Sequence, residues 1–489
     1  MSIDHYESFF DELGFKTTLE HIYQEIQELF LENPFPWVIG YSGGKDSTAV
    51  VQLIWQAIER LPVAQRQFKK VFVITTDTLV ENPVVAAWVE RSLHLMRESA
   101  AQQEMPFEPH NLKPKYKNSF WVNLLGKGYP APRAKFRWCT ERLKIWPSNE
   151  FILNVANESG ETILALGTRK AESATRARTM VKHEKKRTRD RLSPNSHIEN
   201  CLIYTPIEDW TNDDVWLFLT RTDNPWGLRN TELLELYKDA TEDRECPLVV
   251  NLDDSTPSCG SSRFGCWTCT LVTRDRSLEA MVNNDPQNHW LKPLIKFREY
   301  LATKGDDENR DFRRMQGNVQ LFHDAPIHGP YLQSYREFLL EHLLLIEQEM
   351  RAIAPEQFKD LELITFEELQ EIRRIWIVEK HEIEDHLPQI YEKAKGKAYP
   401  DEPGGFYHFF GEDELKILAE VCNHDRLSYE MLRELIDIEW SFRTKLRRAG
   451  LFDRLEKAIQ RSFYENEEDA VSFAKNIEKI SMQLQGDLK

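Results

Sequence analysis

The chain has 489 residues, which is too long for a single hydrophobic core and predicts two or three domains. Its composition, 41% hydrophobic and 29% charged, is typical of a soluble globular protein, and no apolar run is long enough to span a bilayer. The formal net charge of −17 disfavours loose, non-specific binding of nucleic acid by the chain as a whole. Because the first residues lack a basic start followed by an apolar stretch, we expect no secretory signal and a cytoplasmic location.

The first predicted element is a helix from Thr17 to Asn33. Thr17 and Glu20 have the spacing of a capping box, and apolar side chains recur at helical spacing along one face. Two prolines follow and end the helix before the first predicted strand. We therefore expect residues 1–33 to form an N-terminal helical segment ahead of a domain that spans 34–300.

A glycine-rich turn follows the first predicted strand, which begins at Trp37. The turn reads Ser-Gly-Gly-Lys-Asp-Ser, and an apolar helical pattern comes after it. Glycines let the backbone approach a phosphate closely, and the amides and dipole of the new helix attract the anion. Lys45 adds a positive charge, and Asp46 is placed to face a Mg²⁺ ion or its water. The spacing differs from the loop of the Walker nucleoside triphosphatases. The predicted phosphate-binding residues are Ser42, Gly43, Gly44, Lys45, Asp46 and Ser47.

Further strands alternate with helices along the first 300 residues. The stretch 71–77 is apolar until it ends at Asp77, the stretch 162–167 ends in Gly167, and 201–207 is another largely apolar run. Helices are predicted to begin after Asn82 and Thr211, which are good N-cap residues. This alternation predicts an α/β fold: a parallel sheet with helices on both faces and functional groups where the strands leave the sheet.

From about residue 300 the strand signals fade and long helical patterns dominate. The clearest patterns cover 331–354, 428–446 and 451–464, with a loop rich in proline and glycine over 395–406. These helices carry no catalytic constellation. We therefore expect 301–489 to form a mainly α-helical C-terminal domain for packing or for docking a partner.

The glycine loop and later motifs resemble one family. The loop resembles the S-G-G-x-D-S loop of the PP-loop ATP pyrophosphatases, which cleave ATP between its α and β phosphates. The stretch GTRKAESATR, from Gly167 to Arg176, resembles the G-x-R-x-x-E-S-x-x-R segment of their phosphoadenylyl-sulfate reductase-like branch, and 206–216 resembles a further motif that we attribute to packing. Arginines suit bidentate binding of oxyanions, and Glu172 can orient them. The resemblance implies catalytic roles for Lys45, Asp46, Arg169 and Arg176, and nucleotide contacts from Asp77, Gly167, Arg169 and Glu172.

Four cysteines are candidates for a metal site, three of them clustered with the spacing C-x₆-C-x₂-C and one far upstream. The four are Cys139, Cys259, Cys266 and Cys269. Four thiolates suit either zinc or a [4Fe–4S] cluster, and the spacing alone does not separate the two. The resemblance favours the cluster, because several members of the branch hold one. Of the other three cysteines, Cys201 is expected in a strand core and Cys422 in a helix, neither with a role. Cys246, in a polar loop, stays open as a carrier of sulfur, beside direct delivery by a partner or an open iron of the cluster.

Two basic stretches stand out in this acidic chain. Residues 113–144 interleave lysines and arginines with aromatic residues, and 169–191 is basic with few apolar residues. A solvated run of charge is the usual explanation of such stretches. Both adjoin the predicted nucleotide site and Cys139, so a groove for a phosphate backbone is about as strongly indicated.

The whole pattern from about 35 to 300 resembles the DndC family, the ATP-dependent sulfurtransferases of bacterial DNA phosphorothioation. The surroundings of Cys139 (Arg-Trp-Cys-Thr) and of Cys266 (Phe-Gly-Cys-Trp-Thr-Cys) carry this resemblance. It implies that ATP adenylylates a non-bridging oxygen of a DNA phosphate and that sulfur then displaces AMP. It also implies ATP, Mg²⁺ and a [4Fe–4S] cluster as cofactors, and DNA, a cysteine desulfurase and other subunits of the modification complex as partners.

Three alternatives stay open. An assimilatory reductase of adenylyl sulfate or its 3′-phosphate would need a reactive cysteine near the C-terminus, whereas the last cysteine here is Cys422. A tRNA thiolase would also use ATP and a cluster. A non-catalytic subunit that binds ATP and a cluster would brace a DNA-processing complex.

Overall fold

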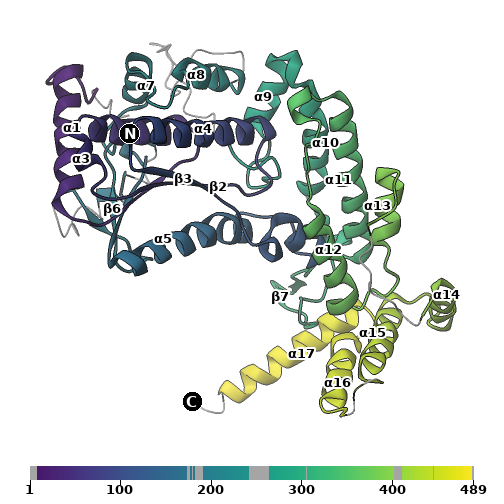
Figure 1. The fold of residues 1–489 in the computed structure, drawn as a ribbon. Coiled ribbons are helices and arrows are strands. Elements are labelled where there is room, and N and C mark those ends of the chain that lie inside the picture. The colour runs from purple at the N-terminus through teal and green to yellow at the C-terminus, as the bar shows by residue number, and fades with distance from the viewer. Residues whose placement is uncertain are drawn as a thin grey trace. The chain divides into compact units, whose positions relative to one another are not determined.

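The computed structural model describes residues 8–172, 177–178, 180–181, 191–241, 264–303, 305–400, 410–443, 445 and 447–486 (Figure 1). The chain divides into two compact units. The first unit comprises Met1–Lys115 and Ala134–Ile295, and the second comprises Tyr116–Arg133 and Lys296–Lys489. Each unit is described by itself below.

The first unit is built on a six-stranded sheet with the strand order β3-β2-β1-β4-β6-β5. The strands are β1 (Trp37–Gly40), β2 (Val71–Thr76), β3 (Phe107–Leu112), β4 (Thr162–Ala165), β5 (Ser193–Pro194) and β6 (Cys201–Tyr204). Every neighbouring pair is parallel except β5 and β6, which pair antiparallel at the edge. In the centre, Trp37 of β1 lies opposite Val71 of β2 and Ile163 of β4.

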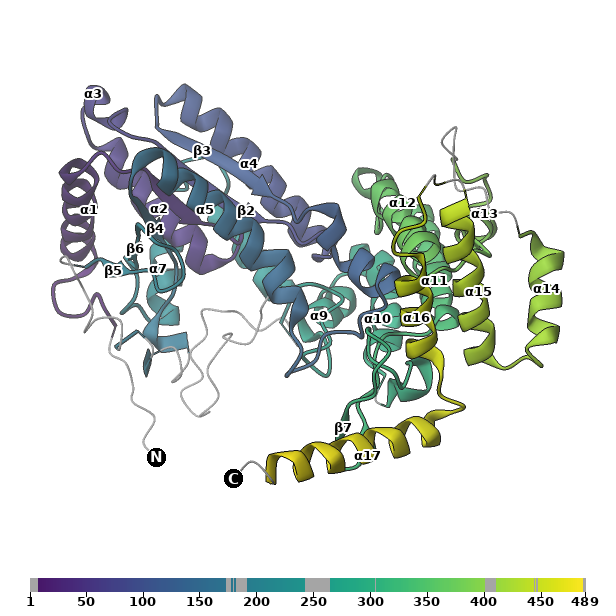
Figure 2. The ribbon, with the colours of Figure 1, turned by 90° about the horizontal axis from the view of Figure 1, so that it is seen from below.

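Helices cover both faces of this sheet, as the sequence predicts. One face packs against α1 (Phe15–Glu32), α2 (Lys45–Glu59), α4 (Pro83–Gln102), α7 (Asn212–Arg221) and α8 (Asn230–Asp239), and the other packs against α5 (Trp146–Ser159). Successive strand residues alternate between the two cores: Trp37 and Ile39 belong to the first and Val38 to the second. Figure 1 shows α4 and α5 on opposite sides of the sheet, and Figure 2 views it from the side of α5.

The N-terminal helix begins earlier than its capping pattern predicts. Helix α1 starts at Phe15 with Gly14 as its N-cap, so Thr17 lies inside the first turn and the predicted capping box does not form. The hydroxyl of the next residue, Thr18, instead donates to the carbonyl oxygen of Gly14 at 2.9 Å. The predicted caps at Asn82 and Thr211 are confirmed, because their side chains accept hydrogen bonds from the amides of Val84 and Asp214.

The second unit is mainly helical, as expected. Its long helices are α11 (Gln333–Ile353), α12 (Phe366–Arg374), α13 (Leu387–Lys395), α14 (Glu412–Val421), α15 (Arg426–Arg443), α16 (Leu451–Ser462) and α17 (Glu467–Gly486). Buried leucines of α11, among them Leu339 and Leu343, lie at its centre. Helices α15 and α16 pack side by side (Figure 2).

The expected boundaries after residues 33 and 300 can be compared with this division. Helix α1 shares its buried face, including Ile26 and Phe30, with the core of the first unit. The segment Tyr116–Arg133 belongs to the second unit, where Trp121 donates from Nε1 to the carbonyl oxygen of Leu363 at 2.7 Å. The remaining division falls after Ile295. Nothing in the local pattern of 116–133 indicates this change of unit, because the segment is held by contacts distant in sequence.

Two further helices follow the sheet, α9 (Arg276–Asn284) and α10 (Lys292–Leu301). No helix within the described ranges is both long enough and apolar enough to cross a bilayer.

Candidate functional site

The site lies where the order of the strands in the sheet reverses, between β1 and β4. The chain builds β1, β2 and β3 outward on one side and then crosses to β4 on the other side of β1. In open parallel sheets, ligands bind at the carboxyl ends of the strands beside such a switch point. The glycine loop follows β1, and the stretch Gly167–Arg169 follows β4, so both predicted motifs meet there.

The glycine loop is held by its own hydroxyl groups. Ser47 Oγ accepts from the amide of Ser42 at 3.1 Å, lies 3.1 Å from Ser42 Oγ, and donates to the carbonyl oxygen of Gly44 at 3.0 Å. Gly43 has a φ of +73°, a conformation that glycine adopts without strain. Helix α2 begins at Lys45, so the loop leads directly into a helix N-terminus, as predicted.

The backbone at Gly167 lies so close to the backbone of Asp46 that only glycine fits there. A side-chain Cβ at this position would lie 2.9 Å from the carbonyl carbon and oxygen of Asp46 and 3.1 Å from the amide of Ser47. The loop after β4 therefore packs directly on the glycine loop. This contact brings together the two motifs, which are more than 100 residues apart in the sequence.

Asp46 links the two positively charged groups of the site. Lys45 Nζ lies 2.9 Å from Asp46 Oδ2, and Arg169 Nε donates to Asp46 Oδ1 at 2.7 Å. Arg169 is buried and also donates to the carbonyl oxygen of Trp210 at 3.2 Å. Both carboxylate oxygens already bind cations of the chain, so a Mg²⁺ ion at Asp46 would share them with Lys45 and Arg169. A magnesium site here stays a prediction.

Two residues of the site have no signal in the sequence. The Tyr237 hydroxyl accepts a hydrogen bond from the amide of Lys45 at 3.2 Å, and Trp88 Nε1 donates to the carbonyl oxygen of Gly43 at 3.2 Å. Burial raises the pKa of Tyr237 above its usual range, so its hydroxyl stays protonated. Both residues sit in ordinary amphipathic helices, and only the folded structure brings them to the loop.

A cavity of about 810 Å³ opens at the carboxyl ends of the central strands. Its volume is within the range of small-molecule sites. Part of its wall comes from Tyr41 and Ser42 at the start of the glycine loop, and part from Thr75 to Asp77 at the end of β2. Apolar side chains form much of the rest: Val85, Val89, Ile145, Ile152, Leu164, Leu166 and Phe264. An apolar chamber beside a phosphate-binding loop suits a nucleoside.

Asp77 lines this cavity, as its position after β2 predicts. Its Oδ1 accepts from the amide of Leu79 at 2.9 Å. Burial raises the pKa of Asp77, and the hydrogen bond from Leu79 opposes that rise. The carboxyl group can thus accept a hydrogen bond from a hydroxyl or amino group in the cavity. Contact with adenosine stays a prediction.

The Cys-x-x-Cys turn docks on the loop that follows β2. Cys266 pairs with Glu81 in an antiparallel bridge, and the amide of Trp267 donates to the carbonyl oxygen of Val80 at 3.1 Å. Within the turn, the amide of Cys269 donates to the carbonyl oxygen of Cys266 at 3.0 Å. The Cys266 thiol lies 3.4 Å from Thr78 Oγ1 and 3.6 Å from Glu81 Oε1.

Lys144 connects the cavity with the thiols. It lines the cavity together with Glu81, and its Nζ lies 3.3 Å from Glu81 Oε1. Its charge interacts with the thiols of Cys266 and Cys139, and Cys139 interacts in turn with Cys269. Three of the four predicted ligands therefore share one neighbourhood, beside the wall of the cavity.

Burial governs the ionisation of these groups. It raises the pKa of Cys266 to about 12, with Glu81 adding to the rise, and it raises the pKa of Cys139. Burial by itself would lower the pKa of Lys144, but Cys266 and Glu81 raise it above its ordinary value. Near neutral pH the lysine is charged and these thiols are protonated. A metal would have to displace their protons, as thiolate ligands require.

The donor set agrees in kind with a thiolate site. In the part of the chain that the structure describes, however, no group of three or more His, Cys, Asp or Glu side chains is arranged to hold a metal ion. The predicted ligand Cys259 lies outside the described residues, as does Cys246. The four-cysteine site and its [4Fe–4S] cluster stay a prediction. Cys201 and Cys422 are buried in the two units.

Of the second motif, Gly167 and Arg169 reach the glycine loop, and Glu172 ends a 3₁₀ turn, Lys170–Glu172. Its amide donates to the carbonyl oxygen of Arg169 at 3.3 Å. Arg176 lies outside the described residues, so its predicted role beside Glu172 is untested.

The structure divides the first basic stretch between the two units. Lys117 and Lys127 belong to the second unit, and Lys127 Nζ donates to the carbonyl oxygen of Lys117 at 3.0 Å. Lys135 and Arg137 belong to the first unit and are exposed on either side of Phe136, itself 42% exposed. Most of the second basic stretch lies outside the described residues.

The fold and the site together define a nucleotide-binding α/β domain with a glycine loop at the switch point of a parallel sheet. Residues 36–272 match the family model of the phosphoadenosine phosphosulfate reductase domain. The match covers just under half of the chain and supports a phosphoadenosine phosphosulfate reductase-like PP-loop domain there, in agreement with the resemblance at the level of the branch.

Among curated proteins, the chain is similar to an uncharacterised protein of Methanocaldococcus jannaschii. The two are 26% identical over 225 residues, which is 46% of this chain and 37% of the other. The match thus spans little more than a third of the length of that relative.

Two solved structures show a distant likeness. One is the FMN adenylyltransferase of Candida glabrata in complex with FMN and an ATP analogue, at 11% identity and a TM-score of 0.26, covering 49% of this chain and 64% of that one. The other is the U34-tRNA thiolase NcsA of Methanococcus maripaludis with its [4Fe–4S] cluster, at 13% identity and a TM-score of 0.26, covering 59% and 81%. Likenesses of this size carry no inference about function.

Proposed function

We propose that the chain is an ATP-dependent sulfurtransferase of the DndC type, which replaces a non-bridging oxygen of a DNA phosphate with sulfur. One observation carries this proposal. The cavity that begins at the glycine loop is also lined by Lys144 and Glu81, which interact with the thiol of Cys266. Activation by ATP and delivery of sulfur must act on the same DNA phosphate group. This cavity adjoins both the glycine loop, suited to ATP, and the thiol of Cys266, suited to sulfur chemistry.

The reaction has two displacements. First, a non-bridging oxygen of the DNA phosphate attacks the α-phosphorus of ATP, the bond to the β-phosphate oxygen breaks, and pyrophosphate leaves. Next, a hydrosulfide equivalent attacks the activated DNA phosphorus, and AMP leaves with the former non-bridging oxygen. A cysteine desulfurase supplies the sulfur as a persulfide, and a thiol reductant releases it. ATP and DNA undergo no net oxidation.

The residues of the loop stabilise charge on the phosphates. Amides at the start of α2 and the side chains of Lys45 and Arg169 are positioned to neutralise the negative charge that develops as pyrophosphate leaves. The apolar walls of the cavity enclose the adenosine and exclude water, which would otherwise hydrolyse the activated phosphate. Cys139, Cys259, Cys266 and Cys269 would hold a [4Fe–4S] cluster whose four irons are all occupied by thiolates, so the cluster would fix these segments and the desulfurase would deliver the sulfur.

The exposed residues ahead of Cys139 suit contact with DNA. Lys135 and Arg137 carry positive charge in a chain whose formal net charge is −17, and Phe136 between them offers a partly exposed ring. Two cations flanking an aromatic side chain are suited to a phosphate backbone and to an unstacked base. DNA, the desulfurase and further subunits are therefore part of the proposal.

A reductase of adenylyl sulfate or its 3′-phosphate is the second candidate, favoured by the family match over 36–272. Such a reductase needs an accessible nucleophilic cysteine. Cys422 does not suit this role, because it is buried and packs in a cluster with Ile383, Leu415 and Leu418.

The proposal is tested by measuring AMP formation from ATP labelled at the α-phosphate, in the presence of sulfide and one acceptor at a time. We expect duplex DNA to stimulate AMP formation. Lys45→Ala should reduce the stimulated rate by about 100-fold or more, because the positive charge of the lysine beside the phosphates is lost. Lys70→Ala, at an exposed lysine paired with Glu108, is the matched control and should retain the rate.

Stimulation by tRNA in place of DNA would contradict the proposal and identify a thiolase. Release of sulfite from adenylyl sulfate with a thiol reductant, without consumption of ATP, would contradict it and identify a reductase. Full DNA modification by Lys45→Ala, with an unchanged circular dichroism spectrum, would instead indicate a non-catalytic subunit.

A further inference from the structure

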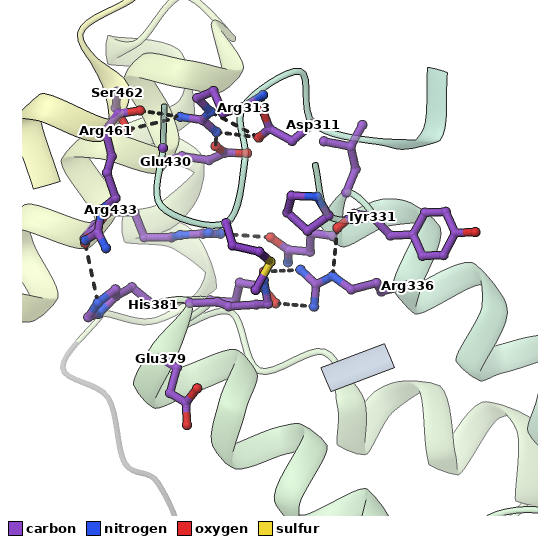
Figure 3. Close-up of a pocket in the computed structure, with 18 of the residues that line it drawn as sticks. Asp311, Arg313, Tyr331, Arg336, Glu379, His381, Glu430, Arg433, Arg461 and Ser462 are labelled. Atoms are coloured by element: carbon purple, nitrogen blue, oxygen red, sulfur yellow. Dashed lines mark hydrogen bonds and ion pairs between the residues drawn. The ribbon is translucent and has the colours of Figure 1, made fainter. Parts of the chain in front are cut away.

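A second, smaller cavity lies within the C-terminal unit, far from the glycine loop in sequence. It has a volume of about 170 Å³ and is enclosed by the loop 311–317, the first turn of α11, the segment 379–382, helix α15 and the end of α16. Figure 3 shows that the labelled Arg313, Arg336 and Arg433 come from different parts of this unit and converge on it. Six arginines and lysines and five carboxylates line it.

The carboxylates of this lining are already engaged by cations. Asp311 and Glu430 each bind Arg313 at 2.6 Å, and both also bind Arg426. Glu382 binds Arg336 through both oxygens. Two pairs complete the set: Glu379 with Arg374, and Glu434 with Arg461. The negative charge of the lining carboxylates is therefore balanced by ion pairs with neighbouring arginines.

Three donors of the lining remain for a ligand. In the described part of the chain, Lys380 Nζ has no hydrogen bond or ion pair. The side chain of Arg314 has only one hydrogen bond, of 3.2 Å, from Nη1 to the carbonyl oxygen of His328. Arg433, which is 4% exposed, donates through Nη1 to Glu384 at 2.6 Å and to Gln333 at 3.0 Å, and only its Nε is buried without a hydrogen-bond partner. A buried donor without an acceptor is costly, so it favours a ligand that supplies one.

The pKa of Lys380 is consistent with anion binding. Burial and the neighbouring charge of Arg336 lower the pKa of Lys380 to about 8, against the attraction of Glu382, Asp311 and Glu430. At neutral pH Lys380 is therefore still mainly protonated, and an anion placed among these donors would raise its pKa.

We propose that this cavity binds a phosphate group through Lys380, Arg314 and Arg433. Phosphate offers several acceptor oxygens to a fork of guanidinium and ammonium donors. The volume is below the roughly 300 Å³ of usual small-molecule sites, so a nucleoside attached to the phosphate would have to remain outside. The site is independent of the reaction in the first unit. Its phosphate belongs either to a nucleic-acid backbone or to a small anion such as pyrophosphate.

The test is calorimetric titration of the full-length chain with inorganic phosphate. Lys45→Ala is used as the parent, so that binding at the glycine loop is suppressed. We expect the parent to bind phosphate, Lys380→Met in that parent to weaken binding at least tenfold, and Lys397→Met, at an exposed lysine outside the lining, to leave it unchanged. Absence of binding by the parent, or equal affinity after Lys380→Met, would overturn the proposal. If Lys380→Met does not fold, Arg314→Gln at the partly exposed loop takes its place, with the same expected loss.

Titrations with pyrophosphate and with a short DNA duplex distinguish the two sources. A loss of duplex affinity in Lys380→Met that parallels the loss for phosphate identifies a nucleic-acid backbone. A loss confined to phosphate and pyrophosphate identifies a free anion. Failure of the DNA-stimulated AMP assay would leave these titrations unaffected, because the two sites are tested in different units.

Discussion

At the scale of single residues, the site depends on Asp46 and on the glycine that packs against it. Asp46 binds Lys45 and Arg169 at once and so fixes the two cations beside the glycine loop. Gly167 lets the loop after β4 approach the backbone of Asp46 closely enough for Arg169 to reach it. The positions of the charges therefore depend on a residue that carries no functional group.

Gly167→Ala should displace the glycine loop without unfolding the domain. The added Cβ would lie 2.9 Å from the carbonyl carbon and oxygen of Asp46, and since these are backbone atoms, the loop itself must shift. We expect the affinity for ATP, measured by calorimetry, to fall at least tenfold. Gly265→Ala is the control, because a Cβ there meets nothing within 4 Å. Equal affinity of the two variants would show that the approach at Gly167 does not position the loop.

The sequence predicts some of these residues and misses others for a physical reason. Loop residues such as Gly43 and Lys45 follow a local rule, because a glycine turn between a strand and a helix binds anions wherever it occurs. Tyr237, Trp88 and Lys144 follow no such rule. Each belongs to an ordinary helical or basic pattern, and its role comes only from contacts made across the fold.

At the scale of elements, Lys69 joins the end of α1 to the start of β2. Its Nζ donates to the carbonyl oxygen of Asn33 at 2.9 Å and lies over the rings of Phe30 and Trp37. Burial lowers the pKa of Lys69 to about 7, and Glu32 only partly opposes this. The folded state thus binds this proton less tightly than the unfolded chain, whose lysine keeps its ordinary pKa.

Stability of the first unit should therefore rise with pH above 7. Between the folded pKa of about 7 and the ordinary lysine pKa near 10.5, the unfolded state binds more protons, so the free energy of unfolding increases with pH. We expect an increase of the order of 2 kcal/mol from pH 7 to 9, measured by urea unfolding, since each unit of pH is worth about 1.4 kcal/mol. Lys69→Met should be more stable at pH 7 and lose this rise. Lys70→Met, at the exposed neighbour, should retain it; the same pH dependence in both variants would contradict the assignment.

Elements were predicted best where their pattern is local. The strands that carry continuous apolar runs and the helices with good caps at Asn82 and Thr211 agree with the structure. Strand β3 was not predicted, because Pro109 and polar residues interrupt it, as an edge position tolerates. Helix α5 lies between the basic stretch 113–144 and the strand expected at 162–167, where the sequence predicts no element. The start of α1 differs from the prediction because Gly14, not Thr17, is the cap.

At the scale of the whole molecule, the two candidate sites lie in different units. The glycine loop, its cavity and the thiols of Cys139, Cys266 and Cys269 belong to the first unit, and the cavity lined by Lys380 and Arg433 belongs to the second. The sequence predicts the change from α/β to helical character. It does not predict that 116–133 contributes to the second unit, because membership of a unit is set by distant contacts such as that of Trp121 with Leu363.

The predicted cluster is checked by anaerobic purification with iron, sulfide and zinc analysis and a visible spectrum. We expect about four irons and four sulfides per chain, lost in Cys266→Ser because one of four thiolate ligands is removed. Cys422→Ser, at a buried cysteine of the second unit, is the control and should retain the metal. One zinc and no iron would make the cysteines a structural clamp and leave sulfur delivery to a partner.

The central claim is that ATP activates a DNA phosphate by adenylylation of its non-bridging oxygen. It is tested most directly with duplex DNA whose phosphates carry ¹⁸O at the non-bridging positions, incubated with the protein, ATP, Mg²⁺ and sulfide. The account predicts that the AMP formed contains ¹⁸O from the DNA, in equal amount to the phosphorothioate detected by mass spectrometry after nuclease digestion. AMP that contains oxygen from water alone, with no phosphorothioate in the DNA, would contradict it.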